Sequence, residues 1–368
     1  MALSLVFVIL SVTLPFIAAV PSPATTECTG TISSLSDVAA AVKCTTVNIN
    51  AFTVPAGSTF ELDLAEGTTV NMEGDVTFGE ENWAGPLFQV SGTSITFNGN
   101  GHTFDGNGAF YWDGQGINGG VTKPDPMMKI KISGTMTDVK VLNSPARVFS
   151  VSNPAKLTLS QITIDNSAGD ASNSKSGSKS AGHNTDGFDV SSNNLTIENS
   201  IIMNQDDCLA LNKGTNIVFQ GNTCSGGHGI SIGSISSDAT VSGVTISGNT
   251  ITNSDQALRI KTKSSATDAS VSGVTYSGNT ASNIRKFGVI IDQSYPSTLG
   301  TPGTGVKLSD INFTGSKTTI SVESGAERVA VNCGSGACTG TWDWSELSVS
   351  GGSAGKITNF SGISGYSE

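Results

Sequence analysis

The chain has 368 residues, a net charge of −11 and only 13% charged residues. An acidic chain lacks the basic surface that nucleic-acid binding needs, which argues against a nucleic-acid partner. Low charge is also a property of some disordered proteins, but apolar residues recur regularly throughout this sequence, so we expect a folded, strand-rich protein.

Residues 1–19 are almost wholly apolar and end in small residues, a pattern typical of a secretory signal peptide. A transmembrane anchor is the alternative, but the run is short and is broken by Pro15. We therefore expect a secreted, extracellular protein without a membrane partner. Cleavage is expected at Ala19 or, after a short pro-segment, near Ala24, which leaves residues 25–368 as one domain.

The cysteine count is even, as a disulfide set in a secreted chain should be, and zinc binding would need CxxC-type spacing or histidine partners. Residues 36–43 form the one plausible helix near the start, with a small apolar face suited to capping the end of a domain. The cysteines fall naturally into three sequence-local pairs, although other connectivities are formally possible: Cys28 and Cys44 around this helix, Cys208 and Cys224, and Cys333 and Cys338.

A short alternating strand ending in asparagine recurs along the middle of the chain. The terminal asparagines Asn199, Asn222, Asn249 and Asn279 are separated by 23, 27 and 30 residues. Repeats of this length without intervening helices predict an all-β, single-domain, right-handed parallel β-helix, in which asparagines can stack from coil to coil. A β-propeller is the main structural alternative, but its blades are typically longer, about 40 residues.

Polar clusters lie about one coil apart in this region. Asp186 and Asp207 are separated by 21 residues, as are Asp207 and His228. Because coils of a β-helix stack at about 4.8 Å, residues one period apart should lie above one another. Each cluster alone is more typical of a solvated turn, but their coincidence predicts one site. The clusters are Asn184-Thr185-Asp186, Asp206-Asp207, Gly227-His228-Gly229 and Arg259-Ile260-Lys261.

Adjacent strand residues point to opposite faces, so Asp206 and Asp207 can share a cleft only if the backbone bends there. We therefore predict a turn or bulge at this pair.

The four clusters, in this order and together with Tyr295, resemble the polygalacturonases of glycoside hydrolase family 28, particularly the fungal endo-acting enzymes. The resemblance extends over most of the mature chain. One departure is that many fungal members carry a further cysteine pair after the equivalent of Cys338.

The resemblance implies hydrolysis of α-1,4 bonds between galacturonates with inversion at the anomeric carbon. It implies that Asp206 is the general acid, that Asp186 and Asp207 activate water, and that His228 sets their protonation. The residues implied in substrate binding are Asn184, Gly229, Arg259, Lys261 and Tyr295. Inverting glycosidases usually hold their two catalytic carboxyl groups about 6.5–9.5 Å apart. The stacking of coils suggests a shorter distance between Asp186 and Asp207.

Alternatives to this function are an exo-acting polygalacturonase, a calcium-dependent pectate lyase and a non-catalytic carbohydrate-binding β-helix. We expect no cofactor, no metal, a polygalacturonate or pectin substrate, and a monomer. Three sequons are candidate glycosylation sites: Asn194, Asn312 and Asn359.

Overall fold

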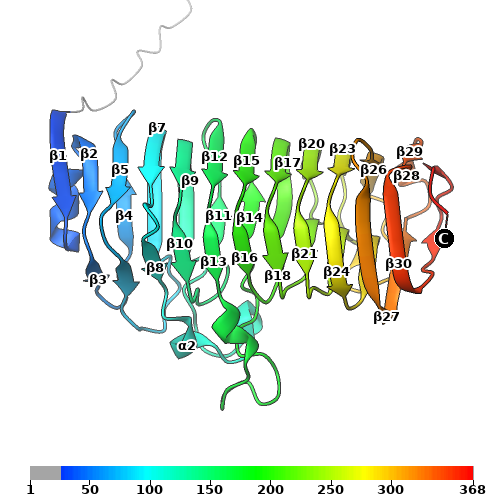
Figure 1. The fold of residues 1–368 in the computed structure, drawn as a ribbon, viewed down its shortest axis with the longest axis horizontal. Coiled ribbons are helices and arrows are strands. Elements are labelled where there is room, and N and C mark those ends of the chain that lie inside the picture. The colour runs from blue at the N-terminus through cyan, green and yellow to red at the C-terminus, as the bar shows by residue number, and fades with distance from the viewer. Residues whose placement is uncertain (1–25, 368) are drawn as a thin grey trace, which may run out of the picture.

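The computed structural model describes residues 26–367, so the predicted signal peptide and its cleavage position lie outside the described residues. The described chain is a right-handed parallel β-helix, as predicted, and forms one elongated domain (Figure 1). Thirty strands belong to one continuous sheet, in which strands pair in parallel with those of the preceding and following coils. Among the described residues, no helix is long and apolar enough to cross a membrane.

The strands of the N-terminal coils are β1 (Thr26–Ile32), β2 (Cys44–Ile49), β3 (Phe52–Val54), β4 (Phe60–Asp63), β5 (Thr69–Met72), β6 (Val76–Phe78), β7 (Phe88–Asn98), β8 (Thr103–Asp105), β9 (Met128–Thr137) and β10 (Lys140–Leu142). The strands of the middle coils are β11 (Phe149–Val151), β12 (Leu157–Ser160), β13 (Thr163–Asp165), β14 (Phe188–Ser191), β15 (Leu195–Glu198), β16 (Ile201–Met203), β17 (Leu209–Gln220), β18 (Thr223–Ser225), β19 (Ile230–Ile235), β20 (Thr240–Ser247), β21 (Thr250–Thr252) and β22 (Gln256–Lys263). The last strands are β23 (Ala269–Ser277), β24 (Thr280–Ile284), β25 (Phe287–Tyr295), β26 (Val306–Phe313), β27 (Thr318–Asn332), β28 (Cys338–Thr339), β29 (Trp342–Asp343), β30 (Leu347–Ser353), β31 (Ile357–Thr358) and β32 (Ile363–Ser364).

Apolar side chains alternate along these strands and fill the interior of the solenoid. Phe149 of β11 and Phe188 of β14 are opposite each other in register and stack at a ring-centroid distance of 5.1 Å. Equivalent positions on successive coils therefore lie directly above one another, which fixes the residues facing the outside of the solenoid in columns as well.

Part of the predicted asparagine stack is present. Asn249 Nδ2 donates to Asn279 Oδ1 at 2.9 Å, and Asn222 N donates to Asn249 Oδ1 at 2.9 Å. The prediction is wrong for Asn199, which is exposed, because the neighbouring Ser200 takes the register position and its N–H donates to Asn222 Oδ1.

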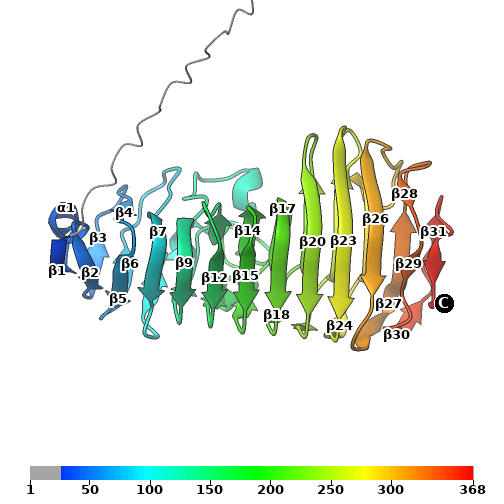
Figure 2. The same ribbon diagram turned by 90° about the horizontal axis from the view of Figure 1, so that it is seen from above.

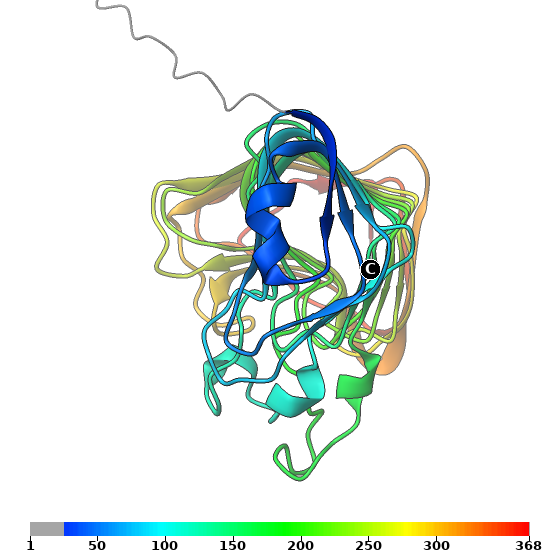
Figure 3. The same cartoon turned by 90° about the vertical axis from the view of Figure 1, so that its left-hand side faces the viewer.

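Both ends of the solenoid are closed. The predicted capping helix is present but shorter than expected, as η1 (Leu35–Asp37) followed by α1 (Val38–Ala41), and it lies over the N-terminal end (Figure 3). The Cys28–Cys44 disulfide spans this cap. At the other end, β29 pairs with β32, and Trp342 and Trp344 are completely buried. The elongated shape is seen again from above in Figure 2.

Two excursions project together from one side of the middle coils (Figure 1). One carries α2 (Gly108–Tyr111) and η2 (Gly116–Asn118), and the other begins with η3 (Ser167–Asp170). They are joined by Lys175, whose Nζ donates to the Phe110 carbonyl at 2.8 Å and lies over the Phe110 ring. These segments form a raised wall beside the coils that carry the polar clusters.

Candidate active site

A polar groove of about 620 Å³ lies on the outside of the middle coils. Its walls combine η2 residues with side chains of β14, β17, β22 and β25. The sequence-predicted residues that line it are Asn184, Asp186, Asp206, Asp207, Lys261 and Tyr295. His228 lines an adjoining cavity of about 260 Å³, so the predicted cluster lies at the junction of two hollows.

The predicted stacking of the clusters is confirmed by the strand register. Phe188 of β14 pairs with Leu209 of β17, which pairs with Ile230 of β19. Two residues before each of these positions are Asp186, Asp207 and His228, so one column carries all three. Coil stacking therefore brings together residues that are 21 positions apart in the sequence.

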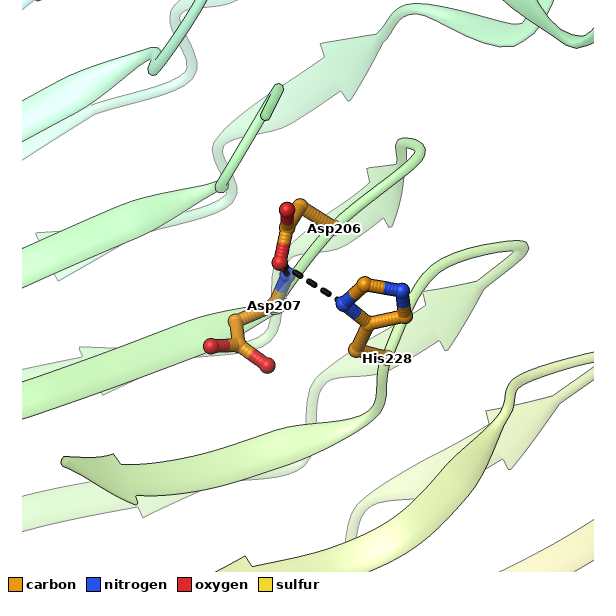
Figure 4. A group of neighbouring side chains, drawn as sticks. All are labelled: Asp206, Asp207 and His228. Atoms are coloured by element: carbon orange, nitrogen blue, oxygen red, sulfur yellow. Dashed lines mark hydrogen bonds and ion pairs between the residues drawn. The ribbon is translucent and has the colours of Figure 1, made fainter. Parts of the chain in front are cut away.

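The backbone bends at Asp206 and Asp207, as predicted, because this pair lies between the end of β16 and the start of β17. The bend is held by the Asp207 N–H, which donates to Asp206 Oδ1 at 2.8 Å. The Cys208–Cys224 disulfide directly follows it and links the residue before β17 to β18. Both carboxyl groups consequently line the same groove, and Figure 4 shows them beside His228.

Asp206 has side-chain donors at both of its carboxyl oxygens. His228 Nδ1 lies 2.8 Å from Asp206 Oδ1, and Asn184 Nδ2 donates to Oδ2 at 2.9 Å (Figure 4). Burial opposes ionisation of Asp206, but the hydrogen bond and charge of His228 outweigh it and hold the pKa below its usual range. Burial lowers the pKa of His228, but its hydrogen bond to Asp206 and the charges of Asp206 and Asp207 together outweigh burial and raise it.

Asp207 makes ion pairs with both predicted cations. Arg259 Nη2 lies 2.9 Å from Asp207 Oδ1, and Lys261 Nζ lies 2.7 Å from Oδ2. Ser231 Oγ also donates to Oδ1 and accepts from Arg259 Nε. Lys261 Nζ lies 5.4 Å from the centre of the Tyr295 ring, which places that tyrosine beside the cations.

Asp186 differs from its two neighbours because no side chain or backbone donor among the described residues reaches its carboxyl group. Its burial, followed by the charge of Asp206, raises its pKa well above the usual range. The protonated carboxyl group favoured by the geometry is therefore Asp186, whereas the resemblance assigns the donated proton to Asp206. Because the charges of the two groups interact, the proton affinity of each depends on the ionisation of the other.

Asn184 connects the wall to the acids. Its Oδ1 accepts from the Ile117 N–H and from Asn118 Nδ2, while its Nδ2 donates to Asp206. Gly229 contributes through its backbone, because its carbonyl accepts from the Cys208 N–H. Its φ is +77°, and a Cβ there would lie 2.1 Å from the Gln256 carbonyl oxygen, so this position next to His228 requires glycine.

The model of the glycosyl hydrolases family 28 matches residues 44–366 of this chain. The chain belongs to glycosyl hydrolase family 28. It is 42% identical over 343 residues to endopolygalacturonase I of Aspergillus aculeatus, covering 91% of this chain and 88% of that protein. It is 46% identical over 323 residues to the endo-polygalacturonase of Sclerotinia sclerotiorum, covering 84% and 80%.

A solved structure of endopolygalacturonase I from Stereum purpureum with two galacturonates is also similar to this family 28 hydrolase. The TM-score is 0.85 and the identity 55%, over 89% of this chain and 96% of that one.

Four ionisable residues near the site of this family 28 chain were not among those predicted from the sequence. Asp189 lines the groove three residues after Asp186, and its burial raises its pKa to about 6. His183 lines the adjoining cavity, and burial lowers its pKa. Asp255 Oδ2 lies 3.7 Å from His228 Nε2, on the opposite side of the ring from Asp206.

Arg147 is the fourth of these residues, and its place in the site follows from the repeat of the coils. Phe149 pairs with Phe188, so Arg147 occupies the column of Asp186 one coil earlier. The two residues are 39 positions apart, because the coil contains the η3 excursion, and this long separation conceals the relationship.

Asp206, Asp207 and His228 present ligand atoms within 4.8 Å of one another, close enough for a metal ion. Both Asp207 oxygens already accept from Arg259 or Lys261, and these cations oppose a further positive charge. The expectation that this family 28 hydrolase needs no metal stays a prediction.

The three predicted disulfides are present, and the third, Cys333–Cys338, lies near the C-terminal end. Of the glycosylation candidates, Asn194 and Asn359 are exposed and Asn312 is half-buried.

Proposed function

We propose that this family 28 hydrolase is an endo-acting polygalacturonase, which hydrolyses α-1,4 bonds between galacturonates. The observation that carries the proposal is the column of Asp186, Asp207 and His228 beside Asp206, with two cations against it in an open groove. Relatives named endopolygalacturonase, at 42% identity and above, support the same substrate and the endo mode.

In the proposed reaction, Asp206 protonates the leaving oxygen. The protons that it needs are already present in the site, because Asp186 and His228 both have raised pKa values. Transfer of the Asp186 proton to Asp206 leaves Asp186 ionised for the next step. The donors from Asn184 and His228 orient the Asp206 carboxyl group for this transfer.

The ionised Asp186, together with Asp207, then accepts a proton from water as it attacks the anomeric carbon. Attack opposite to the leaving oxygen inverts the configuration. Lys261 and Tyr295 line the groove and are placed to bind a substrate carboxylate, whereas Arg259 is largely covered and acts by fixing Asp207. Asn184 and Gly229 shape this site.

The decisive experiment follows the size and configuration of the products formed from polygalacturonate. Early release of mixed oligomers indicates endo attack, release of only the shortest products indicates exo attack, and NMR of fresh products reads the anomeric configuration. Asp206→Asn should lose nearly all turnover while still binding the polymer, and unchanged hydrolysis would rule out the assigned role.

Two controls separate the other candidate functions. Calcium-dependent pectate lyase activity would be abolished by a chelator and would give an unsaturated product that absorbs in the ultraviolet. A carbohydrate-binding module would bind polygalacturonate without shortening it.

We also propose that the protein is secreted as a glycoprotein and is a monomer. The apolar residues 1–19 and the sequons Asn194, Asn312 and Asn359 support secretion as a glycoprotein. Mass spectrometry of the secreted protein would give the mature N-terminus and the occupied sequons, and light scattering would test the expected monomer.

A further inference from the structure

Arg147 lies in the groove on the opposite side of the acids from Arg259 and Lys261. It precedes β11, which is two coils before β17, whereas the two other cations lie on β22, two coils after β17. At about 4.8 Å per coil, each cationic position lies about 10 Å along the solenoid from the coil of Asp207.

The guanidinium group of Arg147 is held rigidly from one side. Its Nε donates to Asp125 Oδ1 at 2.8 Å and its Nη2 to Asp125 Oδ2, a two-pronged pairing that fixes the plane of the group. Asp125 belongs to the segment just before β9, and its side chain is 19% exposed. A side chain oriented in this way has already lost most of its rotamer freedom, so little entropy remains to be lost on binding a ligand.

The third nitrogen of Arg147 remains available. Nη1 makes no hydrogen bond among the described residues, and the nearest acid is Asp189, whose Oδ1 lies 4.0 Å away. The Arg147 side chain is 34% exposed and lines the groove. The contacts to Asp125 therefore orient the group without using all of its donors.

We propose that Arg147 binds the carboxylate of a second sugar residue of the polymer, on the β11 side of the acids. The proposal rests on the proposed function, since a polygalacturonate chain lying along the solenoid axis carries a carboxylate on each sugar. The chain has a net charge of −11, so a polyanion must be held by local cations rather than by the overall field. Arg147 would thus set the preference for substrates that are long and unesterified on this side.

In the alternative role, Arg147 does not contact the substrate and only offsets the negative charges of Asp189 and Asp186. The groups that face Arg147 are Asp125, Asp186 and Asp189, and it opposes the raised pKa of Asp189. This role would affect every substrate equally and would change the pH dependence of turnover, because it acts through the acids.

The test compares Arg147→Gln with the wild type on pure oligogalacturonides of increasing length. We expect the loss in kcat/KM to grow with oligomer length, reaching about tenfold on the longest, as for the loss of one charge-assisted hydrogen bond. The variant should distinguish partially methyl-esterified from unesterified oligomers less strongly than the wild type does. Arg147→Lys keeps the positive charge but not the planar, two-pronged guanidinium group. Its kcat/KM on the longest oligomers should therefore lie between those of the wild type and Arg147→Gln.

An equal loss at every length, with a shifted pH profile, would overturn the proposal, as would no loss at any length. Thermal melting checks that the variants are folded.

Binding can be measured without turnover in the inactive Asp206→Asn protein. Calorimetry would compare long and short oligomers binding to Asp206→Asn and to the double variant that also carries Arg147→Gln. Weaker binding of long oligomers alone supports the role of Arg147. Failure of the wild type to cleave any oligomer would instead contradict the proposed function.

Discussion

His228 Nδ1 and Asp206 Oδ1 are 2.8 Å apart, and the imidazole is the group that holds a proton in this pair. A second acid lies on the other side of the imidazole ring, with Asp255 Oδ2 at 3.7 Å from His228 Nε2. An acid that must deliver a proton thus lies against a protonated base. The reactivity of Asp206 therefore depends on the whole group of Asp186, Asp206 and His228.

The first prediction concerns His228→Gln. The amide can still donate a hydrogen bond to Asp206, but it supplies no positive charge and no titrating proton. We expect kcat on polygalacturonate to fall about 100-fold, at the low end of what general acid–base groups contribute, with little change in KM. Steady-state kinetics measure this effect, and a variant that keeps wild-type kcat would contradict the role of His228.

The pH dependence of turnover follows from the signs of the shifts. The raised pKa values of Asp186 and His228 mean that both protons are present at mildly acidic pH. Both protons are lost as the pH rises through these values, so activity should decline on the alkaline side. It should also decline in strong acid, where the carboxylates of the polymer become protonated. A flat profile from acid to alkaline pH would refute this prediction.

Asp255→Asn tests the second acid beside His228. Removing the negative charge near Nε2 should lower the pKa of His228, so the alkaline limb of the kcat profile should move to lower pH. Asp255 also pairs with Arg285 and Lys286, so the melting temperature must be measured in parallel. Reduced activity with an unmoved limb would indicate that Asp255 matters only for structure.

Most of the fold could be predicted from the sequence, because a solenoid repeats one local pattern and the spacing of Asp186, Asp207 and His228 equals one coil. The bend at Asp206 followed from elementary strand geometry. The position of Arg147 was hidden because its coil contains an excursion. The pairing of Arg259 with Asp207 could not be predicted either, since spacing shows which residues are near one another but not which partners they choose.

Lys261 and Lys263 form a matched pair on β22. Lys261 is 12% exposed and ion-paired with Asp207, whereas Lys263 is exposed, and both line the groove. Lys261→Met leaves a buried carboxyl group with one fewer partner, so the free energy of unfolding should fall by about 2 kcal/mol. Lys263→Met should change it by less than about 0.5 kcal/mol. Chemical denaturation measures both, and equal effects would show that the ion pair with Asp207 adds nothing to stability.

Gly229 and Gly177 both have positive φ, at +77° and +65°, but they differ in their surroundings. A Cβ at Gly229 would lie 2.1 Å from the Gln256 carbonyl oxygen, whereas one at Gly177 would meet no atom within 4 Å. Gly177→Ala should therefore cost only about 1 kcal/mol, for the left-handed backbone alone.

Gly229→Ala must in addition displace the backbone that carries His228, so we expect a cost of about 3 kcal/mol or more and a disproportionate loss of kcat. Unfolding free energies give the first comparison, and kcat per folded molecule gives the second. A Gly229→Ala protein with the stability and turnover of Gly177→Ala would show that the close approach to Gln256 does not position His228.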